Sequence, residues 1–349
     1  EAELVEVIEA SADRVEPNCE YFGECGGCTY QHISYAKQLE IKVNQFDNAL
    51  KRIAHVDSLP ELSAVVGSEK EYGYRNKITL SPYRTSDDAL EYGYVTHGKH
   101  RTMPIDNCPI ATKAIQEAIP TVKRTAWAHR NATRKKPRQA TIRKDYANDE
   151  AMIYYGTAPE GFPWRREALD GKELSVPLGS FYQINEDIAP KLFSLVTEWL
   201  NELDVSLVLD AFCGSGFLSM GTDHKVIGIE SDSASVTAAN YNAEQWGKKN
   251  PTYKAGNANK MLTRYLNGRS DKVLILDPPR TGCGDAGLKA IERFKPDHIL
   301  YVSCDPATLS RDLKGLLDFG YEIEKRALLD MFPQTFHFES VVMLKAIKK

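Results

Sequence analysis

The stretch Ser206–Phe217, which reads SLVLDAFCGSGF, decides the fold of this chain. A short apolar run ends in Asp210, and the glycine-rich turn Gly214–Gly216 follows at once, which is typical of a buried strand that leads into a tight loop. Further short apolar runs follow, separated by segments with helical spacing: KVIGIE (225–230), KVLILDPP (272–279), HILYVSC (298–304) and SVVMLKAI (340–347). This alternation predicts an α/β fold with a doubly wound, mainly parallel sheet.

Acidic residues stand at the ends of three of these strands: Asp210, Glu230 and Asp277. In an open α/β sheet, ligands bind beyond the carboxyl ends of the strands, so these carboxylates are candidate ligand contacts. Glu230 is placed to accept hydrogen bonds from ribose hydroxyls. Ordinary loop capping is the alternative for Asp210 and Glu230.

The Gly-x-Gly turn alone equally suggests a nicotinamide dinucleotide. The third glycine of that fingerprint is missing, because the position three residues after Gly216 is Ser219. An acidic residue just before the glycines would also repel a pyrophosphate. The combination suits a cationic sulfonium cofactor better.

Cys304 ends one predicted strand and precedes a predicted helix. A thiol near a helix N-terminus has its thiolate favoured by the helix dipole, so Cys304 is a candidate nucleophile, with a small buried hydrophobe as the alternative. Glu339 begins the last predicted strand, beside His337. Its carboxylate could act as a general base if burial raised its pKa, whereas a surface glutamate is the plain alternative.

The front of the chain is rich in cysteine. Three of the seven cysteines, Cys19, Cys25 and Cys28, lie within ten residues, and Cys108 stands in DNCPI. An odd count with this crowding argues against a secreted disulfide framework and favours metal binding in a reducing cytoplasm. From spacing alone, four thiolates could hold zinc or an iron–sulfur cluster equally well. Cys213 and Cys283 match no ligand pattern, so we expect them to be packing residues.

The charge distribution is uneven. The net charge of -4 does not point to nucleic acid, but residues 123–144 hold nine Lys or Arg and no acidic residue. Such a run would attract a phosphate backbone, or it is a solvated basic surface. No apolar run approaches the ~18 residues of a membrane span. Residues 1–10 lack the layout of a signal peptide.

Five motifs in order resemble the RNA 5-methyluridine methyltransferase family: SFYQIN (180–185), DAFCGSGF (210–217), LDPPRTGCG (276–284), VSCDPATLSRDL (302–313) and DMFPQTFHFESVVML (330–344). The similarity extends forward to YRNKITL (74–80) and the cysteine-rich segment. The resemblance implies a Rossmann-like methyltransferase domain, S-adenosylmethionine as the methyl donor and an RNA substrate. A thiolate that adds to carbon 6 of uracil, a methyl donor and a base that removes the carbon 5 proton suffice for methylation of carbon 5.

The resemblance also implies residue roles. Cys304 would be the nucleophile and Glu339 the base. Asp277 would lie between cofactor and uracil, and Gln183 would touch the cofactor. The remaining residues implied in the cofactor pocket are Phe212, Phe217, Glu230 and Asn257. Position 217 more often carries a small or polar residue in the family, which puts a side-chain contact by Phe217 in doubt.

The four cysteines at 19, 25, 28 and 108 match the cluster-bearing members of the family, which implies a 4Fe-4S cluster. The implied domains are a remnant of a β-barrel RNA-binding domain or a linker (1–16), an iron–sulfur and central α+β RNA-binding domain (17–180) and the methyltransferase domain (181–349). The expected partner is RNA, 23S rRNA before tRNA, with no membrane and no obligate protein partner. A non-catalytic iron–sulfur RNA-binding protein is the rival from another class, and a nicotinamide-dependent oxidoreductase is a third reading.

Overall fold

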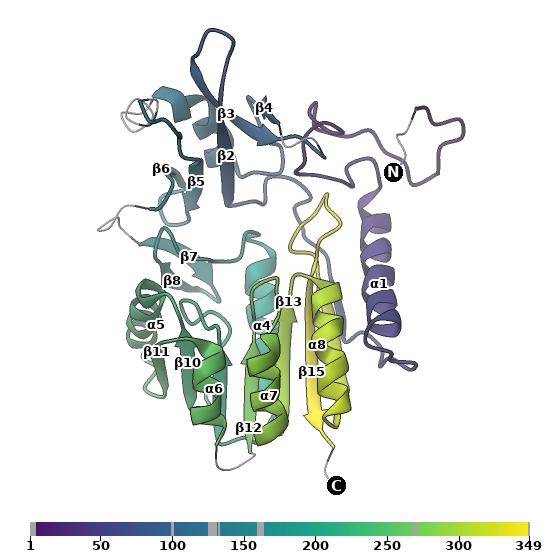
Figure 1. Cartoon of the computed structure of the whole chain (residues 1–349), viewed down its shortest axis with the longest axis vertical. Coiled ribbons are helices and arrows are strands. Elements are labelled where there is room, and N and C mark those ends of the chain that lie inside the picture. Colours follow the sequence, from purple (N-terminus) through teal and green to yellow (C-terminus); the bar gives the residue numbers. More distant parts are fainter. Residues whose placement is uncertain are drawn as a thin grey trace.

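The computed structural model describes residues 5–98, 101–124, 131, 133–158, 164–267 and 271–347. These residues form an eight-stranded sheet, a five-stranded sheet and a two-stranded ribbon (Figure 1). The large sheet has the strand order β1-β14-β15-β13-β12-β9-β10-β11. Its strands are β1 (Ala64–Val66), β9 (Leu207–Ala211), β10 (Val226–Glu230), β11 (Pro251–Ala255), β12 (Lys272–Leu276), β13 (His298–Ser303), β14 (Tyr321–Leu329) and β15 (Glu339–Ala346).

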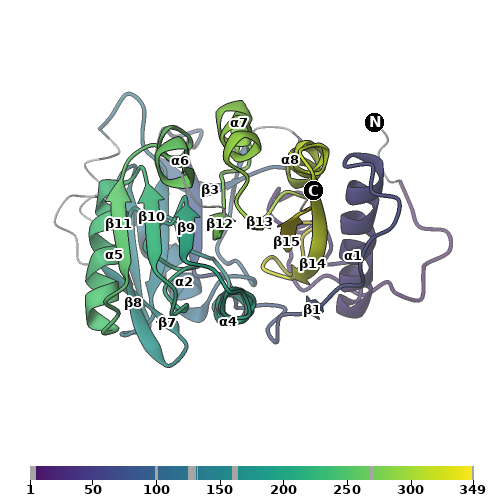
Figure 2. The same ribbon diagram turned by 90° about the horizontal axis from the view of Figure 1, so that it is seen from below.

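The large sheet confirms the predicted doubly wound α/β fold. Strands β9 to β13 pair in parallel, whereas β15 is antiparallel to both of its neighbours. All five residues of β12 are buried, as expected for a parallel strand covered on both faces. The covering helices are α4 (Ile188–Asn201), α5 (Ser233–Gln245), α6 (Ala258–Leu266), α7 (Gly284–Phe294) and α8 (Pro306–Asp318). Figure 2 shows α6, α7 and α8 on one face and α4 on the other.

Helix α1 spans Tyr35–Arg52, and its apolar residues recur at the spacing that puts them on one face of a helix. Phe46 and Leu50 are completely buried, and they pack in the same hydrophobic cluster as α6, α7 and α8. Burial of side chains of this size contributes ~1.5–3 kcal/mol each. The division of the chain near residue 180 stays a prediction. The large sheet nevertheless takes β1 and its flanking helix α1 from the segment before that boundary.

The five-stranded sheet is antiparallel throughout. In the order β4-β3-β2-β5-β6 its strands are β4 (Thr102–Pro104), β3 (Leu90–Val95), β2 (Lys77–Arg84), β5 (Ala140–Asp145) and β6 (Glu150–Tyr155). Helices α2 (Lys113–Ala118) and η1 (Ile119–Arg124) pack beside it. The ribbon of β7 (Arg165–Leu169) and β8 (Lys172–Val176) lies between this sheet and the large sheet (Figure 1).

Two predictions at the front of the chain fall partly outside the described residues. Arg130 of the basic run 123–144 lies there, and the side chain of Lys123 is not described either. Residues 1–4 of the expected remnant are also outside. Within residues 5–16, Arg14 forms a β-bridge with Ile33. None of the described helices combines the length and the apolar character that crossing a bilayer needs.

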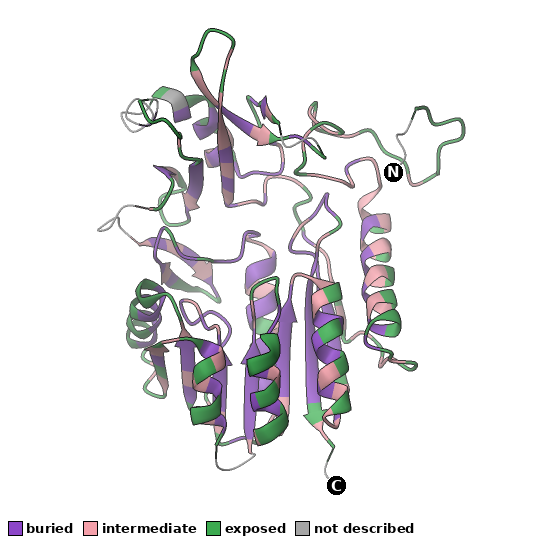
Figure 3. Ribbon diagram, viewed as in Figure 1, coloured by how far each residue is buried: buried purple, intermediate pink, exposed green. Residues whose placement is uncertain are grey.

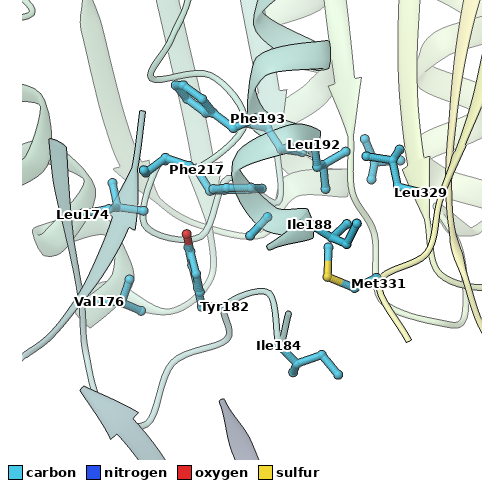
Figure 4. Close-up of a cluster of buried hydrophobic side chains, with 14 of the residues drawn as sticks. Leu174, Val176, Tyr182, Ile184, Ile188, Leu192, Phe193, Phe217, Leu329 and Met331 are labelled. Atoms are coloured by element: carbon cyan, nitrogen blue, oxygen red, sulfur yellow. The ribbon is translucent and has the colours of Figure 1, made fainter. Parts of the chain in front are cut away.

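The core lies on both faces of the large sheet, whose central strands β9, β12 and β13 are buried along almost their whole length (Figure 3). On one face, Tyr182 packs edge-on against Phe217, with ring centroids 5.4 Å apart, and Phe217 also meets Phe193 of α4. Figure 4 shows this cluster. The contacts hold the segment 180–185 over the glycine loop, at the carboxyl ends of the strands.

Candidate functional site

The glycine loop begins where β9 ends. Phe212, Gly214 and Gly216 all have positive φ angles, of 69°, 52° and 88°. A Cβ atom on Gly216 would lie 2.8 Å from Met220 Cε and 3.0 Å from Tyr253 Oη, so no larger residue fits there without displacing them. The loop therefore turns back tightly, and its backbone lines a hollow beyond the sheet.

Asp210 and Asp277 line this hollow, and Glu230 is close enough for its charge to act on both; these three carboxylates are called the acidic wall. Burial, together with the charges of Asp277 and Glu230, raises the pKa of Asp210 to about 7. Burial, and then the charge of Glu230, raise the pKa of Asp277 to about 7. Such clustering of buried like charges is costly, and it is relieved by a cation or a hydrogen-bond donor.

Asp210 shows this need directly. Its Oδ2 accepts a hydrogen bond of 2.6 Å from Ser219 Oγ, whereas its Oδ1 is buried without a partner among the described residues. A buried acceptor left without a donor costs ~1–3 kcal/mol. The donor chemistry of a positively charged amino-acid ligand would satisfy it.

The predicted cofactor residues divide into two groups. Gln183, Phe212, Phe217 and Asp277 line the hollow together with Asp210. Phe217 is almost completely buried in the aromatic cluster, so it serves as a wall.

Glu230 and Asn257 use their side chains locally. A Glu230 carboxylate oxygen accepts from the backbone N–H of Gly214 at 3.2 Å, which ties the glycine loop to β10. Asn257 is exposed, and its side chain caps α6 by accepting from the Lys260 N–H. The structure does not bring Asn257 to the hollow, and its pocket role stays a prediction.

The register of β13 and β15 brings Cys304 and Glu339 together. The last pair in this antiparallel ladder is Ser303 with Ser340, and Ser340 Oγ donates to Ser303 O at 2.8 Å. Cys304 directly follows Ser303 at the end of β13, and Glu339 directly precedes Ser340 at the start of β15. Residues that follow one another in this register lie side by side, so the thiol and the carboxylate share one space.

The electrostatics of the thiol differ from the sequence-based prediction. Burial, followed by the charge of Glu339, raises the pKa of Cys304 to about 11. The prediction that the helix start favours the thiolate is therefore wrong for this arrangement. The physical reasons are the burial of the thiol and then the charge of the neighbouring Glu339 carboxylate.

Arg280 is the functional residue that sequence reasoning missed. Its guanidinium hydrogen-bonds the Cys304 thiol, and this contact and its charge oppose the rise in the pKa of that thiol. Burial, with the charge of Asp277, raises the pKa of Glu339 well above its usual range, and Arg280 opposes that shift too. The signal was present in Asp-Pro-Pro-Arg, where two stiff prolines aim the next side chain.

The loop 330–337 that leads into Glu339 is held from the front of the chain. The buried ion pair of Lys42 with Asp330 joins α1 to the start of the loop at 2.7 Å. Gln38 and Gln334 exchange two hydrogen bonds of 3.0 Å. The carbonyl of Gln334 also accepts from the N–H groups of residues 29 and 30, directly after the cysteine loop. At the end of the loop, burial lowers the pKa of His337 to about 4.

The four predicted metal-ligating cysteines line one cavity of about 440 Å³, and His337 and Arg280 line the same cavity. Burial raises the pKa of Cys28 to about 12 and also raises that of Cys108, and the other thiols of the group add to both shifts. Among the described residues, no three His, Cys, Asp or Glu side chains are close enough to hold a single metal ion. The thiols surround a space and do not converge on one point.

Phe181 and Tyr182 line both the cavity and the hollow behind the glycine loop. The two spaces are therefore neighbours, separated by the segment 180–185. Arg280 of the cavity and Asp277 of the hollow both act on Cys304 and on Glu339. A planar ligand in the cavity and a second ligand in the hollow could approach each other there.

A model of the tRNA (uracil-5-)-methyltransferase family matches residues 169–347. The chain is 31% identical to an RNA methyltransferase of Clostridium acetobutylicum, over 99% of this chain and 87% of that protein. It is 33% identical to the tRNA (uracil(54)-C(5))-methyltransferase of Schizosaccharomyces pombe, over 99% of this chain and 69% of that protein.

Among solved structures, the chain is similar to the Pyrococcus abyssi tRNA (uracil-54, C5)-methyltransferase in complex with S-adenosyl-L-homocysteine. The TM-score is 0.73 at 26% identity, over 97% of this chain and 88% of that one. The likeness therefore includes both sheets and the segment between them.

Proposed function

This chain belongs to the RNA uracil-5-methyltransferase family, and we propose on that premise that it methylates carbon 5 of a uridine in structured RNA, with Cys304 as nucleophile and Glu339 as base. The observation that carries the proposal is the register of β13 and β15, which sets these two side chains next to each other. Asp277 and Arg280 complete the same space.

The acidic wall fits S-adenosylmethionine. This cofactor, when bound, supplies a methyl group on a positively charged sulfur. Asp210 Oδ1 needs a donor, and the clustered carboxylates of Asp210, Glu230 and Asp277 favour a cationic ligand. Gln183 and Phe212 would hold its flanks, and the glycine loop would let the backbone approach it closely. Phe217 would act as a wall behind it, and the proposed contact by Asn257 would require the start of α6 to reach the pocket.

The chemistry follows from the two side chains. The Cys304 thiolate adds to carbon 6 of uracil, and the electron pair moves to the ring as an enolate. Carbon 5 then takes the methyl group. Glu339 removes the remaining proton from carbon 5, and the carbon–sulfur bond breaks to restore the ring and the thiolate. Arg280 stabilises the thiolate when it forms and when it leaves, and the buried setting makes Glu339 a stronger base.

A 4Fe-4S cluster at Cys19, Cys25, Cys28 and Cys108 is part of the proposal. All four cysteines line one cavity, and their match to the cluster-bearing members of the family supports a cluster, with zinc as the alternative that the spacing leaves open. When bound, the cluster would cross-link the cysteine loop to the segment after β4. Measurement of iron, sulfide and zinc in the purified protein decides between the two metals. A cytoplasmic location stays a prediction from the cysteine usage.

For the substrate, we propose 23S rRNA from the resemblance to cluster-bearing relatives, with tRNA as the second candidate. The second candidate is favoured by a specific finding, because the similar proteins of Schizosaccharomyces pombe and Pyrococcus abyssi act on uridine 54 of tRNA. Both substrates require the same chemistry at Cys304 and Glu339.

The test is to incubate the protein with methyl-labelled S-adenosylmethionine and total RNA from a strain that lacks the modification. Label at carbon 5 of a uridine is expected, and mapping the label names the RNA and the nucleotide. Cofactor and RNA binding without any transfer of label would instead support the non-catalytic iron–sulfur RNA-binding protein.

A further inference from the structure

One wall of the cavity carries two cationic side chains from neighbouring strands of the small sheet. Lys77 of β2 and Arg143 of β5 are direct partners in the antiparallel register of the small sheet, and both line the cavity. Like charges directly opposite each other destabilise a sheet. Arg75 and Arg165 add positive charge to the same place, and together these four residues form the basic wall.

Within the part of the chain that the structure describes, neither Lys77 nor Arg143 is in an ion pair, whereas Arg165 is. Arg143 is 2% exposed, and its Nε and Nη1 atoms are buried without a hydrogen-bond partner. The guanidinium of Arg165 pairs with Glu167, but its Nε also has no partner. Burial, together with the charges of Arg143, Arg165 and Arg75, lowers the pKa of Lys77 to about 8.

These costs indicate an absent partner. Unpaired buried guanidinium donors are rare because each loses its hydration without gaining a hydrogen bond. An anion that accepts from Arg143 and Lys77 would supply the missing bonds and remove the repulsion between them. A tetrahedral phosphate oxygen group matches the planar donor fork of arginine especially well.

The proposed cluster is the other source of negative charge in this cavity, and it does not account for this pair. Arg75 is the cation that acts on the Cys108 thiol, where it lowers the pKa. Lys77 and Arg143 do not appear among the groups that shift the pKa of Cys25, Cys28 or Cys108. Arg75 is therefore the residue of the basic wall that acts on a thiol of this group.

We propose that Lys77 and Arg143 form a binding site for one RNA phosphodiester, beside the uridine that enters the cavity toward Cys304. The inference rests on the proposed function, because it takes RNA as the ligand. It adds a fixed contact point for the backbone: the phosphate sits on the small sheet while the base reaches the large sheet. Phosphate contacts set register and orientation without reading sequence, which is what presentation of one base requires.

The experiment uses a fluorescein-labelled RNA of nine adenosines around one central uridine. In a second version, uncharged methylphosphonates replace the phosphodiesters on both sides of that uridine. The wild-type protein should bind the second version roughly tenfold more weakly, the ratio of one lost charge-assisted contact. Arg143→Gln should bind both versions equally, at the weaker level. Its affinity for the charged RNA should also depend less on salt, by a slope of ~0.7.

Lys77→Gln is the second variant, and it protects the test if the buried arginine is needed for folding. Arg84→Gln is the matched control, since it removes the same charge from the exposed end of the same strand, outside the cavity. Equal discrimination between the two RNAs in the wild type and Arg143→Gln would overturn the proposal. Loss of iron without a change in discrimination would overturn it as well, in favour of a role for the pair at the cluster.

The assay separates this site from the proposed chemistry because binding needs neither cofactor nor methyl transfer. If the protein never methylates RNA but still distinguishes the two RNAs through Arg143, the phosphate site is supported and the catalytic proposal is contradicted. Methyl transfer by a protein that shows no discrimination would do the reverse.

Discussion

The acidic wall and the basic wall of the site are built in the same way with opposite charge. On each wall, like charges are buried close together, and a polar atom lacks a partner: Asp210 Oδ1 on one side and two nitrogens of Arg143 on the other. Neither arrangement stabilises the folded chain by itself. The difference in sign matches the two ligands proposed for them, a sulfonium cation on the acidic side and a phosphate on the basic side. Cys304, Glu339 and Arg280 stand between the two, where both kinds of charge act on one thiol.

The largest expected effect comes from removing the thiol between the walls. Cys304→Ala should lower the methylation rate by ~10⁴-fold or more, because no other group can form the bond to carbon 6. Cofactor affinity and RNA affinity should both persist, since neither wall changes. Rates come from transfer of labelled methyl, and affinities come from equilibrium titration.

The matched control is Cys283→Ala, which removes a buried thiol at the start of α7 that lines neither the cavity nor the hollow. It should cost ~1–2 kcal/mol of unfolding free energy at most and leave the rate intact. Full activity in Cys304→Ala would remove covalent catalysis from the account.

The next effect separates the two chemical steps. Glu339→Gln keeps the size of the side chain but removes the base, so turnover should fall by ~10²–10⁴-fold. The nucleophile remains, and the methylated adduct between Cys304 and RNA should accumulate because its carbon 5 proton stays in place. Gel analysis under denaturing conditions measures this adduct. Slow turnover with no accumulated adduct would assign the base to another residue.

A smaller effect tests the acidic wall alone. Asp210→Asn should weaken S-adenosylmethionine binding by ~10–100-fold, since one charged hydrogen bond is worth about 1.5–3 kcal/mol. RNA affinity should not change, because the carboxylate lies away from the basic wall. Calorimetric titration with each ligand provides the two values. Asp223→Asn, an exposed carboxylate paired with Lys248, is the control. Equal weakening of both ligands would break the assignment of one wall to each.

The smallest expected effect concerns pH. With the pKa of Cys304 raised to about 11, the rate should keep rising from pH 7 to 9 and should not level off near the ordinary thiol value of ~8.5. The raised pKa of Glu339 acts in the same direction, because the base must be ionised. Arg280→Gln removes an influence that lowers the pKa of Cys304, so its rate should be ~10-fold lower at pH 8. The two rates should rise in parallel between pH 7 and 9, because the thiol pKa lies above this range in both proteins, and equal rates at pH 8 would exclude this role.

Sequence reasoning succeeded where chain order alone decides position. Asp210, Asp277 and Cys304 follow parallel strands, and parallel strands end at one edge, so their meeting was predictable. Glu339 required more, because its contact with Cys304 depends on the antiparallel register of β15, which a one-residue shift would have destroyed. The sequence indicates that Glu339 starts a strand, but it does not indicate that Cys304 lies beside it.

Contacts between distant segments could not be predicted. The side chains of Lys42 and Asp330 are 288 residues apart in the chain, and no periodicity indicates that α1 holds the loop before Glu339. Lys77 and Arg143 likewise read as separate surface charges until the small sheet pairs them. Asn257, which the resemblance implies in the cofactor pocket, caps α6 with its side chain, and its pocket role stays a prediction.

The most direct test of the central claim uses RNA in which 5-fluorouridine replaces the target uridine. Fluorine at carbon 5 cannot leave as a proton, so Glu339 cannot complete the reaction and Cys304 should stay bonded to carbon 6. Mass spectrometry of the digested protein should find one methylated nucleotide attached to the peptide that contains Cys304. Attachment to a different cysteine, or methylation of ordinary RNA with no trapped adduct on the fluorinated RNA, would contradict the claim that this thiol and this carboxylate act in one pocket.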